Sequence, residues 1–65
     1  MRIELNGARV ETGAITLAEL VAERGFPETA VATALDGAFV PRGARADTAL
    51  AEGARVEVLT PMQGG

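Results

Sequence analysis

One segment of the chain carries the complete set of signals that begin and end an α-helix. Thr16 and Glu19 have the spacing of a capping box, in which each residue satisfies a free backbone N–H of the first turn. Gly25 suits the positive φ that commonly follows a helix, and Pro27 cannot continue one. The sequence therefore predicts a single helix at about 17–24.

Two side-chain roles follow from this helix. Ile15 precedes the cap and is expected to pack on Leu20 as a hydrophobic staple. Glu19 and Glu23 lie one turn apart, and we interpret them as part of a solvated helix face rather than as a catalytic carboxylate pair.

Most of the remaining chain alternates polar and apolar residues, which is the period of a half-buried strand. The dipeptides Asn6-Gly7 and Asp36-Gly37 each separate two such segments. They favour a two-residue hairpin turn, because both turn positions have positive φ. We expect strands within the segments 2–5, 8–12, 31–35, 38–40 and 54–60.

Residues 42–51 show no strand period. Asp47 is expected to cap a single turn through Leu50. Arg42 and Arg45 flank Gly43, and we interpret them as solvent-exposed loop charges, with contact to an anion as the alternative.

The order hairpin, helix, strand, short strand, strand predicts an α+β fold, a roll with a mixed four- to five-stranded sheet packed on one helix. A crossover helix after the first hairpin lets the first and last strands lie parallel at the centre of the sheet. That arrangement is the β-grasp. We expect a β-grasp domain at 1–60 and a flexible C-terminal Gly-Gly tail at 61–65.

Composition excludes several classes of function. The 65 residues include no Cys, His or Lys, so soft metal sites, thiol or imidazole nucleophiles and disulfides are excluded. A net charge of -3 with two aromatic residues argues against nucleic-acid binding. No apolar run has the length of a membrane span, and because the first residues lack the charged-then-apolar pattern we expect no leader. We expect a soluble, cytoplasmic protein that binds no cofactor or metal and is monomeric when free.

The end of the sequence departs from the rest. Pro61 stops the last strand, and Gly64 and Gly65 lack a Cβ, so such a tail fits a slot too narrow for other residues. The reactive group it delivers is the α-carboxylate of Gly65, and Gly64 would serve the threading. The alternative is a frayed glycine terminus without a role.

A tail of this kind needs a docking surface beside it. Leu59 faces away from Val56 and Val58 and is the clearest spare apolar residue. Its neighbours on the same face depend on the strand register, because a one-residue shift would invert the assignment. The candidate partner-binding residues are Leu59, Met62, Gln63, Phe39, Ala32, Ala34 and Arg42.

Nearly the whole chain resembles a known family, in the segments 2–7, 16–20, 31–37, 39–42, 50, 52–58 and 64–65. These residues are similar to the ThiS family, the small sulfur carriers of thiamine biosynthesis within the ubiquitin-like β-grasp superfamily. Two turn positions depart from the family pattern: Asp36 stands where Asn is common, and Ala54 where Asp is frequent.

The resemblance implies a protein substrate rather than an enzyme. An E1-like adenylyltransferase of the ThiF type would use ATP and Mg²⁺ to adenylate the Gly65 carboxylate. Sulfur from the persulfide of a cysteine desulfurase would then displace AMP and leave a thiocarboxylate. That group would donate its sulfur to a ThiG-type thiazole synthase.

Alternatives remain open at this stage. The small subunit of molybdopterin synthase shares the fold and the Gly-Gly end, and other carriers serve tRNA thiolation or cysteine synthesis. Two alternatives come from different classes of function: a β-grasp binding module and a conjugating ubiquitin-like modifier.

Overall fold

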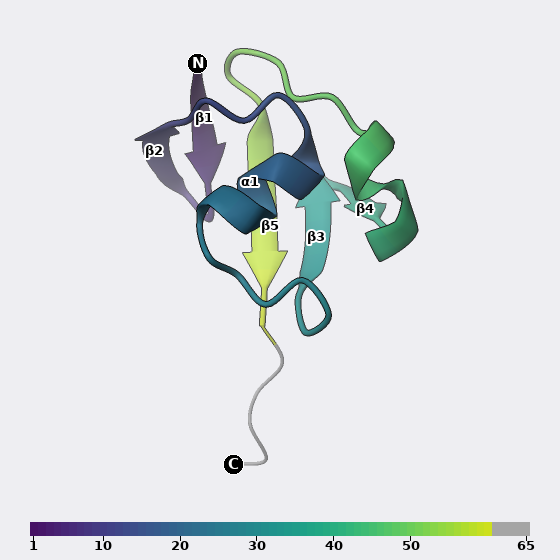
Figure 1. The fold of residues 1–65 in the computed structure, drawn as a ribbon. Coiled ribbons are helices and arrows are strands. Elements are labelled where there is room, and N and C mark those ends of the chain that lie inside the picture. Colours follow the sequence, from purple (N-terminus) through teal and green to yellow (C-terminus); the bar gives the residue numbers. More distant parts are fainter. Residues whose placement is uncertain (61–65) are drawn as a thin grey trace.

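The computed structural model describes residues 1–60 (Figure 1). Within them, the secondary-structure elements in chain order are β1 (Arg2–Leu5), β2 (Ala8–Glu11), α1 (Leu17–Glu23), β3 (Ala32–Leu35), β4 (Ala38–Val40), the 3₁₀-helix η1 (Arg42–Asp47) and β5 (Arg55–Leu59). None of the helices in this part of the chain is long and apolar enough to cross a membrane.

The five strands form one sheet in the order β2-β1-β5-β3-β4. β1 and β5 pair in parallel at the centre, and the other three pairings are antiparallel. The chain returns from the first hairpin through α1, which lies across one face of the sheet (Figure 1). This confirms the predicted α+β roll, a mixed sheet packed on one helix, with five strands.

Both predicted hairpin turns are present. Asn6 and Gly7 have φ values of 50° and 86°, and Asp36 and Gly37 have 50° and 87°. Positive φ at two consecutive residues defines the turn whose twist matches the flanking strands. The turn type therefore follows directly from the dipeptides.

The start of α1 shows one expected cap and one prediction that was wrong. The backbone N–H of Glu19 donates to Thr16 Oγ1 at 3.2 Å, as the capping box requires. The Glu19 carboxylate accepts from the backbone N–H of Ile15 at 2.9 Å. The Ile15 side chain is 61% exposed, so the expected hydrophobic staple on Leu20 buries little of it.

The end of α1 is a Schellman motif. Gly25 has a φ of 73°, its N–H donates to Ala22 O at 3.1 Å, and the N–H of Phe26 donates to Val21 O at 3.0 Å. The helix ends at Glu23, one residue before the predicted limit, with Arg24 as its C-cap.

The core lies between α1 and the sheet face that the helix covers. It is built from alternate residues of the strands and from one stripe of the helix, as the two periodicities require. Its most buried apolar members are Ile3, Leu17, Leu20, Val21 and Val56.

Two predictions for residues 42–51 were wrong. Asp47 ends η1 instead of capping a later turn, because Pro41, with φ fixed near -67°, already starts the 3₁₀-helix at Arg42. Arg45 is not an exposed loop charge: it is only 4% exposed. Its guanidinium lies inside the protein because three oxygen acceptors are available there, as described below.

Candidate functional site

The sheet face opposite α1, which we call the outer face, is divided into a charged and an apolar half. On β1 and β2, Arg2 stands opposite Glu11 and Glu4 opposite Arg9. Glu4 also stands opposite Arg55 on β5. Opposite charges that face each other across strands stabilise a sheet modestly, and of these pairs Arg2 and Glu11 form an ion pair at 3.1 Å.

The other half of the outer face is apolar. Leu59 and Phe39 are 64% and 71% exposed. Leu59 stands opposite Ala32, and Ala34 stands opposite Phe39. We call these four residues, Leu59, Phe39, Ala32 and Ala34, the apolar patch. The residues of β3 that point inward are Thr33, which is buried, and Leu35, which is half-buried, so the strand register places Ala32 and Ala34 on the outer face.

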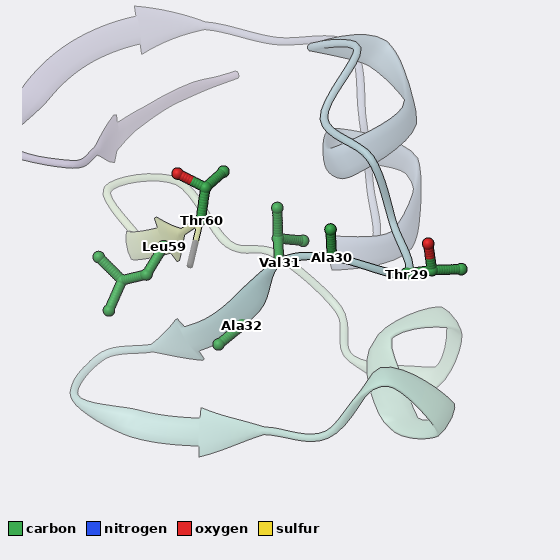
Figure 2. Close-up of a pocket in the computed structure, with 6 residues that line it drawn as sticks. All are labelled: Thr29, Ala30, Val31, Ala32, Leu59 and Thr60. Atoms are coloured by element: carbon green, nitrogen blue, oxygen red, sulfur yellow. The ribbon is translucent and has the colours of Figure 1, made fainter. Parts of the chain in front are cut away.

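A hollow of about 290 Å³ lies beside the last described residue, Thr60. The loop that leads into β3 forms its other wall (Figure 2). In Figure 2, Leu59 and Ala32 point to one side of the sheet, and Val31 and Thr60 point to the other. The hollow and the apolar patch therefore meet at Leu59 and Ala32, where the C-terminal segment begins.

On the side of β5 that faces β1, the end of β5 is paired by a side chain and not by a strand. β1 ends at Leu5 and turns away, while β5 continues to Leu59. Asn6 takes the place of the missing strand: its Nδ2 donates to Val58 O at 3.1 Å, and its Oδ1 accepts from Val58 N–H at 2.8 Å. The last residues before the C-terminal segment are thereby fixed to the sheet.

The loop beside Thr60 is held by the buried guanidinium of Arg45. Its Nη1 donates to Glu28 O at 2.9 Å and its Nη2 to Val31 O at 2.6 Å. Its Nε donates to Thr33 Oγ1 at 2.9 Å. Arg45 thus fixes the wall of the hollow from inside. Sequence reasoning missed this residue, since no local spacing connects it with its three acceptors.

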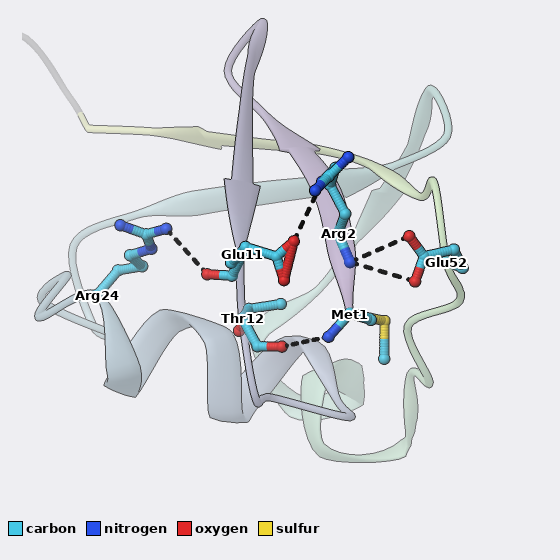
Figure 3. A network of polar contacts seen from close by, with 6 residues as sticks. All are labelled: Met1, Arg2, Glu11, Thr12, Arg24 and Glu52. Carbon is cyan, nitrogen blue, oxygen red and sulfur yellow. Dashed lines mark hydrogen bonds and ion pairs between the residues drawn. The ribbon is translucent and has the colours of Figure 1, made fainter.

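The opposite end of the sheet contains a separate polar network (Figure 3). The Met1 amine donates to Thr12 O at 2.7 Å, and the backbone N–H of Arg2 donates to both carboxylate oxygens of Glu52 at 3.2 Å. The Arg2 Nε forms an ion pair with Glu11 at 3.1 Å. These contacts secure the N-terminus and the edge hairpin, and they form no catalytic arrangement.

The two helix carboxylates are structural, and the interpretation of a merely solvated face was incomplete. Glu23 accepts from Thr12 Oγ1 at 2.7 Å and from the backbone N–H of Gly13 at 3.2 Å, which ties the loop before α1 to the helix end. Glu19 holds Ile15 N–H, as above. Within residues 1–60, no group of three acidic residues is placed to hold a metal ion.

The structure brings together four of the predicted site residues, those of the apolar patch. It does not bring Arg42 to them: Arg42 forms an ion pair with Glu28 at 3.5 Å and lines a hollow together with Ala18 of α1. The predicted residues Met62, Gln63, Gly64 and Gly65 lie outside the described residues.

Comparison with known proteins identifies the family. A profile of the ThiS family matches residues 2–65. A crystal structure of the thiamine biosynthesis protein ThiS from Geobacter metallireducens is similar, with a TM-score of 0.85, 29% identity and full coverage of both chains. A solution structure of a thiamine biosynthesis protein from the same organism has a TM-score of 0.83 at 29% identity, covering all of this chain and 88% of that one.

Comparison with curated protein sequences gave no significant match. The family profile nevertheless extends over nearly the whole chain, and the fold agrees with it. The chain therefore belongs to the ThiS family of small β-grasp sulfur carriers.

Proposed function

We propose that the chain is a protein substrate that carries sulfur on the C-terminal carboxylate of Gly65 for thiamine biosynthesis. One observation carries the proposal: the match to the ThiS family runs through residue 65 and so includes the Gly64-Gly65 end. The helix carboxylates Glu19 and Glu23 accept hydrogen bonds within the domain, which supports the terminal carboxylate rather than this pair as the group for chemistry.

The proposed chemistry answers a specific difficulty, because a carboxylate resists attack by nucleophiles. An E1-like, ThiF-type enzyme would transfer AMP from ATP, with Mg²⁺, to a Gly65 oxygen and release pyrophosphate. The mixed anhydride that results has AMP as a good leaving group. The terminal sulfur of a persulfide supplied through a cysteine desulfurase would displace AMP and form an acyl disulfide. A thiol would then attack the other sulfur of that S–S bond, forming a new disulfide and leaving the thiocarboxylate.

The folded domain would act as the handle by which partners hold the carrier. The apolar patch adjoins the start of the C-terminal segment, so an enzyme that covers Leu59 and Phe39 is well placed to receive residues 61–65. The same surface would serve the ThiG-type thiazole synthase that accepts the sulfur. Because Gly64 and Gly65 lack a Cβ, a narrow active-site channel would admit them.

Intact mass spectrometry tests the proposal. The chain is incubated with ATP, Mg²⁺, a ThiF-type enzyme and a persulfide donor. We expect a mass gain equal to the difference between sulfur and oxygen. A variant that lacks Gly65 is the control and should show no gain. If the full chain also shows no gain with an enzyme that activates another ThiS protein, the proposal is wrong.

The same experiment separates the other classes of function. A covalent adduct between this chain and another protein would identify a conjugating modifier instead. If the thiocarboxylate forms but a thiazole synthase does not consume it, the acceptor belongs to another pathway, such as molybdopterin formation or tRNA thiolation.

A further inference from the structure

A single carboxylate borders the apolar patch. Glu57 stands opposite Ala34 in the β3–β5 register, and Ala34 in turn stands opposite Phe39. A hollow of about 90 Å³ is formed there by Glu57 and its neighbours Ala32, Thr33, Ala34, Phe39 and Leu59, and Glu57 is the one ionisable residue among them.

Glu57 differs from most other carboxylates of the domain. Glu11 and Glu28 form ion pairs with Arg2 and Arg42. Glu19 and Glu52 accept hydrogen bonds from backbone N–H groups. Within residues 1–60, the side chain of Glu57 has neither an ion pair nor a hydrogen bond, and its cross-strand neighbour is the methyl group of Ala34.

This placement restricts what can cover the patch. Glu57 lies two residues before Leu59 on β5 and is separated from Phe39 by Ala34, and all of these residues line the same hollow. A surface that covers Leu59 and Phe39 therefore also removes water from the Glu57 carboxylate. Removing water from an unpaired charge is strongly unfavourable, whereas a close cation offsets that cost. The covering surface is therefore expected to be apolar opposite Leu59 and Phe39 and positively charged opposite Glu57.

We infer that the apolar patch binds a surface of the ThiF-type activating enzyme that presents an Arg or Lys side chain opposite Glu57, beside apolar side chains that meet Leu59 and Phe39. This inference rests on the proposed function, and it adds that the negative charge of Glu57 contributes to the choice of partner. A second copy of this chain does not meet the requirement through a two-fold contact of the patch with itself, because the residues that line the hollow there include no Arg or Lys.

Two variants with the same change of net charge test the inference. Glu57→Gln and Asp47→Asn each remove one negative charge. Asp47 is also exposed and, within residues 1–60, has no side-chain hydrogen bond or ion pair, but it lies at the end of η1. The KM for each carrier is measured in ATP–pyrophosphate exchange with a ThiF-type enzyme, at low and at high salt.

We expect Glu57→Gln to raise the KM by about tenfold or more at low salt, because the enzyme's cation loses its partner. The KM of this variant should also depend less on salt than that of the natural chain. The kcat should stay the same, because the C-terminal segment that reacts is unchanged. Asp47→Asn should stay within about twofold of the natural chain at both salt concentrations.

The inference is overturned if the two variants have equal KM values, which would indicate a general effect of net charge. It is also overturned if Glu57→Gln lowers the KM, which would show that the enzyme surface opposite Glu57 is apolar or acidic. In both cases the natural chain is adenylated and the proposed function stands. If the natural chain is not adenylated at all, the proposed function and this inference both fail.

Discussion

The Nε of Arg45 donates to the Oγ1 of Thr33 at 2.9 Å in the interior of the domain. The Thr33 hydroxyl in turn donates to Val40 O at 2.8 Å, which extends the hydrogen-bond network to β4. With the two backbone carbonyls that Arg45 also contacts, this pair connects η1, the loop before β3 and the β3–β4 hairpin. One buried guanidinium thus connects three segments, of which η1 and the loop before β3 are also joined at the surface by the Arg42–Glu28 ion pair.

Replacing Arg45 tests this role. Arg45→Met leaves Glu28 O, Val31 O and an acceptor site on Thr33 without their donor, so we expect the free energy of unfolding to fall by about 2–4 kcal/mol. Arg42→Met is the matched control and should cost less than about 1 kcal/mol, because its ion pair is exposed. Urea denaturation measures both. Increased stability of Arg45→Met would show that burying the charge costs more than its hydrogen bonds contribute.

The Asn6 side chain gives a second prediction, at a single amide. Asn6→Gly keeps the positive φ of the turn but removes the acceptor of Val58 N–H, so hydrogen exchange at Val58 should become faster. Asp36→Gly is the matched control in the other hairpin, where Asp36 Oδ1 accepts from Arg55 N–H at 2.9 Å. Asp36→Gly should make hydrogen exchange at the Arg55 amide faster and leave the Val58 amide protected. Equal protection of Val58 in both variants would contradict a specific role for Asn6.

Leu59 and Ile15 form a matched pair for the docking surface. Both are exposed aliphatic residues, at 64% and 61%, but only Leu59 belongs to the apolar patch. Leu59→Glu should weaken binding to the activating enzyme by about tenfold or more, with a change in unfolding free energy below about 1 kcal/mol. Ile15→Glu should leave binding unchanged. Calorimetry of binding and thermal unfolding provide the two measurements. Unfolding of Leu59→Glu would show that Leu59 points inward.

Replacing two glycines by alanine should have opposite effects on stability, because Gly25 has a positive φ in the Schellman motif and Gly43 does not. Gly25→Ala places a Cβ at a φ of 73° and should destabilise the protein by about 1 kcal/mol. At Gly43 the φ is not positive and an added Cβ meets nothing within 4 Å. Gly43→Ala should therefore be neutral or stabilise by up to about 1 kcal/mol, since it restricts the unfolded chain. Thermal unfolding distinguishes the two, and an equal loss in both would contradict the assignment.

The features that the sequence predicted correctly are those that neighbouring residues determine. The two hairpin turns follow from dipeptides, and the helix limits follow from caps three residues or fewer away. The outward position of Leu59 follows from strict alternation along β5, whose register the buried Val56 and Val58 determine.

The features that the sequence missed depend on distant partners. Arg45 becomes buried because its acceptors at Glu28, Val31 and Thr33 meet it only after the sheet has formed. Ile15, expected to be a staple, is 61% exposed, and its carbonyl accepts from Leu50 N–H at 2.9 Å, a contact 35 residues away in the sequence. The roles of residues 61–65 stay predictions.

The parallel pairing of β1 with β5 has a mechanical consequence. The two strands run in the same direction side by side, so the N-terminus and the end of β5 lie at opposite ends of the sheet (Figure 1). A force that pulls these two ends apart slides the strands past each other and loads the bonds from Glu4 N–H to Ala54 O and from Asn6 N–H to Val56 O together, in shear. Mechanical unfolding by pulling on both ends would therefore have to break these hydrogen bonds at the same time. A hairpin pulled at its open end instead loses its hydrogen bonds one after another.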